Sequence, residues 1–292
     1  MHPVLFKIGN ITLYSYGLFV ALGFMAALWL ANRRAQQQNI RPEFISDLFF
    51  VILASSLIGA RFFYVILNYS EFRHDFVGMF KIWNGGLVFY GGFLFALAGA
   101  LVFVRRQGVD LWTTADVLAP PIALGHALGR MGCLFAGCCY GRSCDLPWAI
   151  EFHNPDSLAP LNLPMHPTQI YSIISNLVIF SLLILMERIM EGRTDPKAGQ
   201  KSGQKSGQRT DQKAGPKAGK EKAGEKIRTR GMIFWTYIML YGLFRSVIET
   251  FRGDFRGDFF MDVLSVSQAI GIAMSVIAAF VLFFLSRRQL HG

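Results

Sequence analysis

Seven apolar stretches recur along this chain, each close to the length of about 20 residues that a helix needs to cross the hydrocarbon core of a bilayer. Hydrophobic residues make up 52% of the sequence and charged residues only 16%, whereas a soluble domain carries about 25% charged residues. The fourth stretch is the weakest, because Pro120, Pro121, His126 and Arg130 interrupt it. The sequence therefore predicts an all-α integral membrane protein with about seven transmembrane helices, at residues 14–32, 46–67, 85–104, 115–136, 168–187, 231–250 and 264–286.

Lys and Arg residues set the expected orientation, because cytoplasmic loops of membrane proteins carry the basic excess. That excess is concentrated at 188–230, which places the N-terminus outside and the C-terminus inside. Residues 192–229 repeat Lys, Ala, Gly, Ser and Gln and cannot bury a core. We therefore expect a single transmembrane domain over residues 1–292, interrupted by a disordered cytoplasmic linker at 192–229, either a passive spacer or a partner-binding segment. The linker also supplies most of the net charge of +10, which favours membrane lipid over nucleic acid as the partner.

Ionisable groups at membrane depth are costly and usually face a cavity or a partner. Three arginines fall in the outer halves of the predicted helices, and a carboxylate and two tyrosines lie at the same level. This convergence predicts a site that opens to the outer leaflet. The alternative is that the arginines reach the headgroups as structural anchors. The six residues are Arg61, Arg130, Arg245, Glu249, Tyr16 and Tyr90.

The sixth predicted helix shows this pattern best. Tyr241, Arg245 and Glu249 are spaced four residues apart, so they share one helix face. Glu249 can hold the guanidinium of Arg245 so that its donors face a phosphate. A salt bridge within the helix, without chemistry, is the alternative.

Two glycine-rich runs accompany these residues. Residues 129–142 contain four glycines between which the chain can leave a helix, and backbone N–H groups freed there would form an anion site with Arg130. Residues 83–92 place Tyr90 between two glycine pairs at a helix start.

Taken in order, these runs resemble the bacterial prolipoprotein diacylglyceryl transferase family. The resemblance covers nearly the whole chain except 188–230. It implies transfer of diacylglyceryl from phosphatidylglycerol to the lipobox cysteine thiol of a prolipoprotein signal peptide, at the bacterial cytoplasmic (inner) membrane and without a cofactor. A thioether forms and glycerol phosphate leaves. The matching runs are Tyr14–Gly17, Gly59–Arg61, Trp83–Gly92, Gly129–Arg142, His166–Tyr171 and Tyr241–Arg252.

The resemblance and the polar residues together give the expected site. The leaving phosphate needs an anion-stabilising environment, which suits arginines in a site of low dielectric constant. We expect catalytic roles for Arg130, Arg245, Glu249, Tyr90 and Tyr16. We expect phosphatidylglycerol to bind Arg130, Arg245, Gly141, Arg61 and Tyr241.

This chain departs from the family pattern at three positions. Tyr90 stands where the family commonly has His, and Cys133 and Cys138 stand where it commonly has Asn and Glu. Histidine is the natural base for the thiol proton, whereas a tyrosine with a pKa of about 10 is a poor one. The sequence therefore leaves the base unassigned.

Four cysteines lie within 12 residues, at Cys133, Cys138, Cys139 and Cys144. Structural thiols or one disulfide are expected first, and redox chemistry second. No metal site is expected, because the spacing is not the usual Cys-x-x-Cys zinc pattern. The cluster nevertheless allows a rival function, a membrane thiol oxidoreductase. A second rival is a transporter of an anionic solute, which needs a water path to the inside, where no ionisable residue is evident in the inner halves of the predicted helices.

Overall fold

The computed structural model describes residues 2–9, 11–73, 76–81, 85–192, 230–253, 259–260 and 264–290 of the chain. The linker expected at 192–229 lies outside these ranges apart from Gly192, its first residue.

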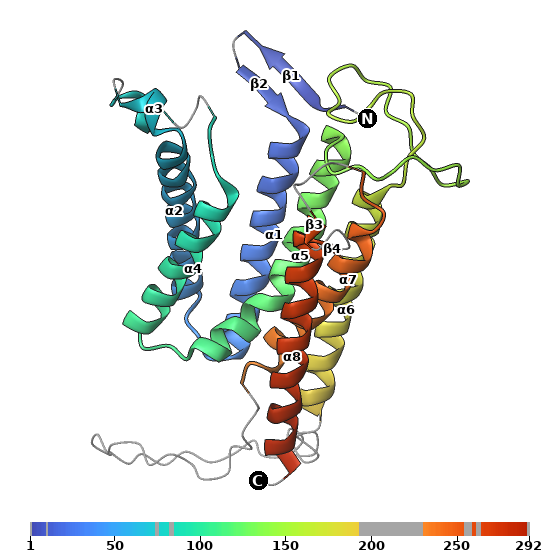
Figure 1. The fold of residues 1–292 in the computed structure, drawn as a ribbon. Helices are drawn as coiled ribbons and strands as arrows, with labels where there is room; N and C mark the ends of the chain where they lie inside the picture. Colours follow the sequence, from blue (N-terminus) through green and yellow to red (C-terminus); the bar gives the residue numbers. More distant parts are fainter. Residues whose placement is uncertain are drawn as a thin grey trace, which may run out of the picture.

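Helices dominate the fold, which confirms the predicted all-α membrane protein (Figure 1). Two short antiparallel pairs were not predicted: β1 (Val4–Ile8) with β2 (Ile11–Tyr14), and β3 (Phe259–Phe260) with β4 (Leu264–Ser265). Two further short helical segments are α3 (Tyr69–Phe72) and a 3-10 turn at Gly78–Phe80. The long helices are α1 (Ser15–Gln37), α2 (Pro42–Leu67), α4 (Phe89–Arg106), α5 (Leu111–Ala136), α6 (Thr168–Gly192), α7 (Met232–Glu249) and α8 (Val266–Leu290).

Within the described chain, six helices are long and apolar enough to cross a membrane: α1, α2, α4, α5, α6 and α8. Helix α7, the sixth of the seven expected spans, is not among them. It equals α4 in length, at 18 residues, but it includes Arg245 and Glu249, which lower its hydropathy. It nevertheless carries the chain back from the end of α6 to the start of α8 (Figure 1). The number of seven crossings therefore stays a prediction.

Helix α5 was expected to be the weakest span, yet it is continuous through Pro120 and Pro121. Both prolines are buried, and Ala119 and Ala123 pack beside Ile179 of α6 in one apolar cluster. Proline removes backbone hydrogen bonds inside a helix. Packing of α5 against its neighbours offsets that loss.

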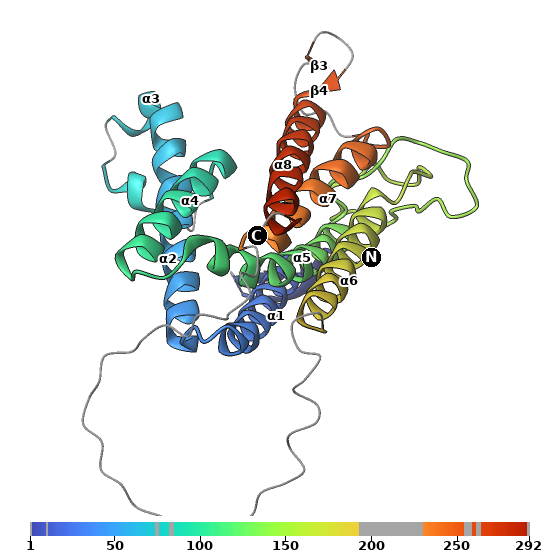
Figure 2. The same ribbon diagram turned by 90° about the horizontal axis from the view of Figure 1, so that it is seen from below.

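The long helices pack as two groups (Figures 1 and 2). Helices α2 and α4 form a pair on one side, whereas α1, α5, α6, α7 and α8 pack in succession on the other. Small residues bring the backbones close: a Cβ added at Gly59 would lie 2.5 Å from the Gly91 carbonyl oxygen, between α2 and α4. The N-terminus and the C-terminus lie at opposite ends, which we call the N-terminal and C-terminal ends of the bundle (Figure 1).

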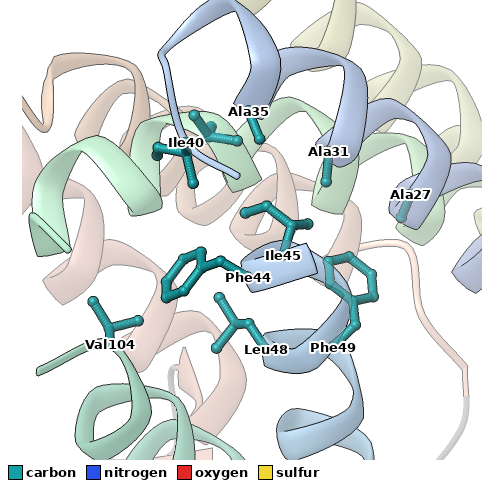
Figure 3. Close-up of a cluster of buried hydrophobic side chains, with 10 residues drawn as sticks. Ala27, Ala31, Ala35, Ile40, Phe44, Ile45, Leu48, Phe49 and Val104 are labelled. Carbon is teal, nitrogen blue, oxygen red and sulfur yellow. The ribbon is translucent and has the colours of Figure 1, made fainter. Parts of the chain in front are cut away.

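An apolar cluster joins the two groups near the C-terminal end (Figure 3). Phe44, Ile45 and Leu48 of α2 lie against a row of buried alanines on α1, and Val104 of α4 completes the contact. Alanines at a spacing of four residues let the helices approach closely. The cluster fixes the turn between α1 and α2.

A buried arginine lies close to this cluster. Arg34 of α1 forms an ion pair with Glu187 of α6 and donates from Nε to the Val117 carbonyl oxygen at 3.0 Å and from Nη2 to the Asp116 carbonyl oxygen at 3.1 Å. The Asp116 carboxylate accepts hydrogen bonds from the Gly231 and Phe234 amides at 2.7 and 2.8 Å, at the start of α7. The expectation that the inner halves of the predicted helices hold no ionisable residue was wrong, because Asp116 and Glu187 lie there. These carboxylates, however, are engaged in helix-to-helix contacts.

Candidate active site between α5, α6 and α7

Two of the predicted arginines meet at one pocket. Arg130 comes from α5 and Arg245 from α7, and residues of α6 close the third side. Tyr241, one turn before Arg245, lines the same pocket. The structure thus brings together three of the residues that the sequence proposed for phosphatidylglycerol binding. The full lining is His126, Arg130, Ser172, Ser175, Asn176, Tyr241, Phe244, Arg245 and Ile248.

Glu249 holds Arg245 in place. The two side chains form an ion pair one helical turn apart, and they are only 14% and 6% exposed. Arg252 approaches the same carboxylate, with its Nε 3.8 Å from Glu249 Oε2. A carboxylate shared by two guanidiniums is strongly fixed, and it leaves donors of Arg245 for a ligand in the pocket.

Arg130 is partly buried and faces the pocket. Among the residues that the structure describes, none forms a hydrogen bond or an ion pair with its guanidinium. An arginine in an apolar bundle is costly without a counter-charge. An anion bound in the pocket would supply that charge.

Arg245 and Tyr241 also line a second pocket, on the other side of α7. Its remaining lining is Gly242 from α7 and Ser267, Ile270, Gly271 and Met274 from α8. Arg245 therefore lines both pockets.

Sequence reasoning missed one whole wall of the first pocket. His126 was treated only as an interruption of the fourth span, yet its ring lies 5.2 Å from that of Tyr241. Ser172, Ser175 and Asn176 follow a spacing of three and four residues in an otherwise apolar helix, a signal that could have been read as a polar face. The Asn176 Oδ1 atom is buried and has no hydrogen-bond partner in the described part of the chain.

Arg61 does not line this pocket. It is 8% exposed, and its guanidinium donates to four carbonyl oxygens: those of Gly78 and Met79 at 2.6 and 2.8 Å, and those of Gly85 and Gly86 at 2.8 and 3.1 Å. These bonds fasten the segment between α2 and α4. The geometry supports the anchoring alternative for Arg61 over direct phosphate binding.

The other predicted site residues lie around the pocket instead of in it. Tyr90, at the start of α4, is 65% exposed. The Gly141 amide donates to the His166 carbonyl oxygen at 3.1 Å, and a Cβ at Gly141 would lie 2.5 Å from that same oxygen. Gly141 thus packs a loop. Tyr16 lies near enough to Arg130 and Cys133 to interact with both electrostatically.

Three of the four cysteines gather at the end of α5. The Sγ atoms of Cys133, Cys138 and Cys139 all lie within 4.8 Å of one another, whereas Cys144 is not in the group. All four are free thiols, so the structure contains none of the disulfides considered from the sequence. Hydrogen bonds from Cys133 and Cys138, together with the charge of Arg252, lower the pKa of Cys139.

The chain matches a known protein family over most of its length. The family described as prolipoprotein diacylglyceryl transferase matches residues 3–204 and 220–284. The chain belongs to this family. The gap in the match, 205–219, falls in the low-complexity segment outside the described residues.

Relatives with curated names agree with this placement. A phosphatidylglycerol–prolipoprotein diacylglyceryl transferase of Clostridium tetani is 29% identical over 96% of this chain and 96% of its own length. Those of Trichormus variabilis and Aeromonas hydrophila are 33% and 31% identical, over 94% and 99% of this chain and 87% and 93% of their own lengths. The similarity therefore extends over the whole membrane region.

Proposed function

We propose that this protein transfers the diacylglyceryl group of phosphatidylglycerol to the lipobox cysteine thiol of prolipoprotein signal peptides. The thiol sulfur forms a bond to the glyceryl carbon, the carbon–oxygen bond to the phosphate breaks, and glycerol phosphate leaves. The convergence of Arg130 and Arg245 on one polar pocket carries the proposal, because the leaving group is an anion. The family membership supplies the substrate class.

The pocket geometry suggests a division of roles. Arg130 and Arg245 bind the phosphate and stabilise its charge as the bond breaks. Glu249 is a positioning residue, because it contacts the Arg245 guanidinium and does not line the pocket. Tyr241 sits between the two pockets and is placed to orient the headgroup.

The remaining predicted residues take less direct roles in this proposal. Tyr16 and Tyr90 offer hydroxyl donors near the start of α1 and α4. Arg61 and Gly141 act through loop structure. Because both acyl chains must stay in lipid while the headgroup reacts, we place the site at the outer leaflet of the bacterial inner membrane.

The two rival functions receive less support. A thiol oxidoreductase would use the cysteine cluster but has no need of the arginine pocket. A transporter of an anion needs a path through the C-terminal end, where Arg34, Glu187 and Asp116 are engaged in contacts between helices.

Purified protein incubated with phosphatidylglycerol vesicles and a lipobox peptide tests the proposal. Mass spectrometry should show a peptide that has gained one diacylglyceryl group on its cysteine, and the same peptide with serine at that position should gain none. An unmodified cysteine peptide, with reduction of an added quinone instead, would favour the oxidoreductase.

A further inference from the structure

The three-thiol cluster has a chemistry that the proposed transfer leaves unused. Three sulfurs within 4.8 Å of one another exceed what one disulfide can employ. A tetrahedral zinc site with bonds of about 2.3 Å separates its sulfurs by about 3.8 Å, so side-chain rotations of roughly 1 Å would form it. Thiolates are soft ligands that favour zinc over magnesium or calcium.

The backbone holds these thiols in place. Cys133 lies in the last turn of α5, and Gly137 ends the helix in the left-handed conformation at φ 75°. Cys139 is also left-handed, at φ 59°. Two buried side chains of α6 then clamp the turn: Thr168 Oγ1 donates to the Cys139 carbonyl oxygen at 2.7 Å, and Gln169 Nε2 donates to the Cys138 carbonyl oxygen at 2.9 Å. The thiols are therefore preorganised as a set.

Charge around the cluster suits a bound dication. Three thiolates and one Zn²⁺ carry a net charge of −1, and Arg252 interacts with Cys139 and is 6% exposed. The guanidinium offsets the remaining charge. Glu249, the nearby carboxylate, is already paired with Arg245 and Arg252, and so it is not available to accept a thiol proton.

The cluster adjoins the proposed reaction site. Cys133 is one helical turn beyond Arg130 on α5, and Tyr16 is close enough to interact electrostatically with all three thiols and with Arg130. We propose that Cys133, Cys138 and Cys139 bind one Zn²⁺ as thiolates and leave its fourth position open for the acceptor thiol of the prolipoprotein. This inference rests on the proposed transferase function.

The zinc ion accounts for thiol activation without a side-chain base. The acceptor thiol binds the open position and releases its proton to water, because a thiol bound to zinc is deprotonated. The resulting thiolate attacks the glyceryl carbon, its electron pair forms the carbon–sulfur bond, and the glycerol phosphate oxygen takes the electron pair of the bond that breaks. The thioether product carries no negative charge and leaves the metal.

Metal binding can be measured on the full-length protein. After chelation, the purified protein is equilibrated with Zn²⁺ alone, and bound metal is determined by mass spectrometry. We expect one equivalent in the wild type and in the matched control Cys144→Ser, and loss of that equivalent in Cys133→Ser, Cys138→Ser or Cys139→Ser. With Co²⁺ in place of Zn²⁺, the sulfur-to-metal absorption band should grow on addition of a lipobox peptide and not on addition of its serine counterpart.

Activity of the unmutated protein gives an independent test. Chelation should lower turnover by about 100-fold or more, the contribution of a group that removes the thiol proton, and Zn²⁺ should restore it. Full turnover in metal-free protein overturns the zinc inference and leaves the transferase function standing. Absence of stoichiometric zinc, a disulfide within the cluster of the native protein, or a cobalt band insensitive to the cysteine peptide also overturns it. Absence of transfer at any metal loading overturns the proposed function instead, whatever the metal content.

Discussion

Arg34 and Arg130 lie at opposite ends of the same bundle and are used in opposite ways. Arg34 directs its guanidinium at Glu187 and at two carbonyl oxygens of α5, and it is 4% exposed. Arg130 lines a polar pocket and has no such partner in the described part of the chain. One arginine fastens three helices together, whereas the other has donors left for a ligand.

The difference teaches which arginines of a membrane bundle deserve a functional interpretation. When all the donors of a buried arginine are bonded to protein groups, those bonds offset the free-energy cost of burying its charge. An arginine that faces a pocket without a counter-charge needs an anion from outside the protein. Arg61 belongs with Arg34 in this respect, because backbone carbonyls take its donors.

The largest effect is expected at the buried ion pair between Arg34 and Glu187. Glu187→Gln leaves a buried guanidinium without its counter-charge, so the free energy of unfolding should fall by about 3–5 kcal/mol. Turnover of the folded fraction should not change. Denaturation in mixed detergent micelles measures the first quantity and the peptide assay the second. The double variant Arg34→Met/Glu187→Leu should recover most of the stability. If Glu187→Gln kept full stability and lost turnover, the proposed difference between a structural Arg34 and a ligand-binding Arg130 would be wrong.

The opposite result is expected at the pocket. Lysine keeps the charge but loses the bidentate geometry, so Arg130→Lys and Arg245→Lys should each lower turnover by about 100- to 1,000-fold, like the removal of an oxyanion donor. Melting temperatures should stay close to that of the wild type. Arg34→Lys is the matched control, with reduced stability and normal turnover per folded molecule. Wild-type rates in both pocket variants would mean that these arginines only anchor the helices.

Two glycine variants at the N-terminal end of the bundle test how much packing in this region contributes to stability. Gly141→Ala places a Cβ against the His166 and Phe251 carbonyl oxygens, at 2.5 and 2.8 Å, and should cost about 1–3 kcal/mol of stability. Gly129→Ala, in the same glycine-rich run, meets nothing within 4 Å and should cost none. Equal stability of Gly141→Ala and Gly129→Ala would show that the loop around Gly141 can shift to accommodate the added Cβ at little cost in free energy.

The smallest effect is expected at Tyr90. One neutral hydrogen bond contributes about 0.5–1.5 kcal/mol, so Tyr90→Phe should slow turnover by roughly two- to tenfold if the hydroxyl helps to orient a substrate. Tyr69→Phe, an equally exposed tyrosine at 64% against 65%, should leave the rate unchanged. Identical rates for both variants would assign Tyr90 a packing role only.

The sequence predicted the fold well, because hydrophobic length is a local property that needs no partner. Predicted spans 46–67 and 115–136 lie within α2 and α5, and the sequence alone indicated Arg130, Arg245 and Tyr241 as site residues. What it did not predict depends on contacts between distant segments. Arg34 and Glu187 are 153 residues apart, and no periodicity connects them.

The arrangement of the cysteines could not be predicted either, although they lie close together in the sequence. Their spacing of five residues and then one matches no common metal motif, and this spacing did not predict that three of the thiols would meet. The left-handed turn at Gly137 folds the chain back and brings Cys133, Cys138 and Cys139 together. Side chains of α6 stabilise this turn, and the spacing of the cysteines alone does not predict those contacts.

The ion pair on α7 has a consequence for how the protein is made. A segment with Arg245 and Glu249 is a poor substrate for insertion into lipid by itself, whereas α8 is the most apolar of the six membrane-length helices. The two helices touch through small residues: a Cβ at Gly242 would lie 2.5 Å from the Gly271 carbonyl oxygen, and Ser275 Oγ donates to the Met239 carbonyl oxygen at 3.0 Å. We therefore expect α7 to enter the bilayer together with α8, as a helical hairpin, and a chain that stops before α8 should fail to insert α7.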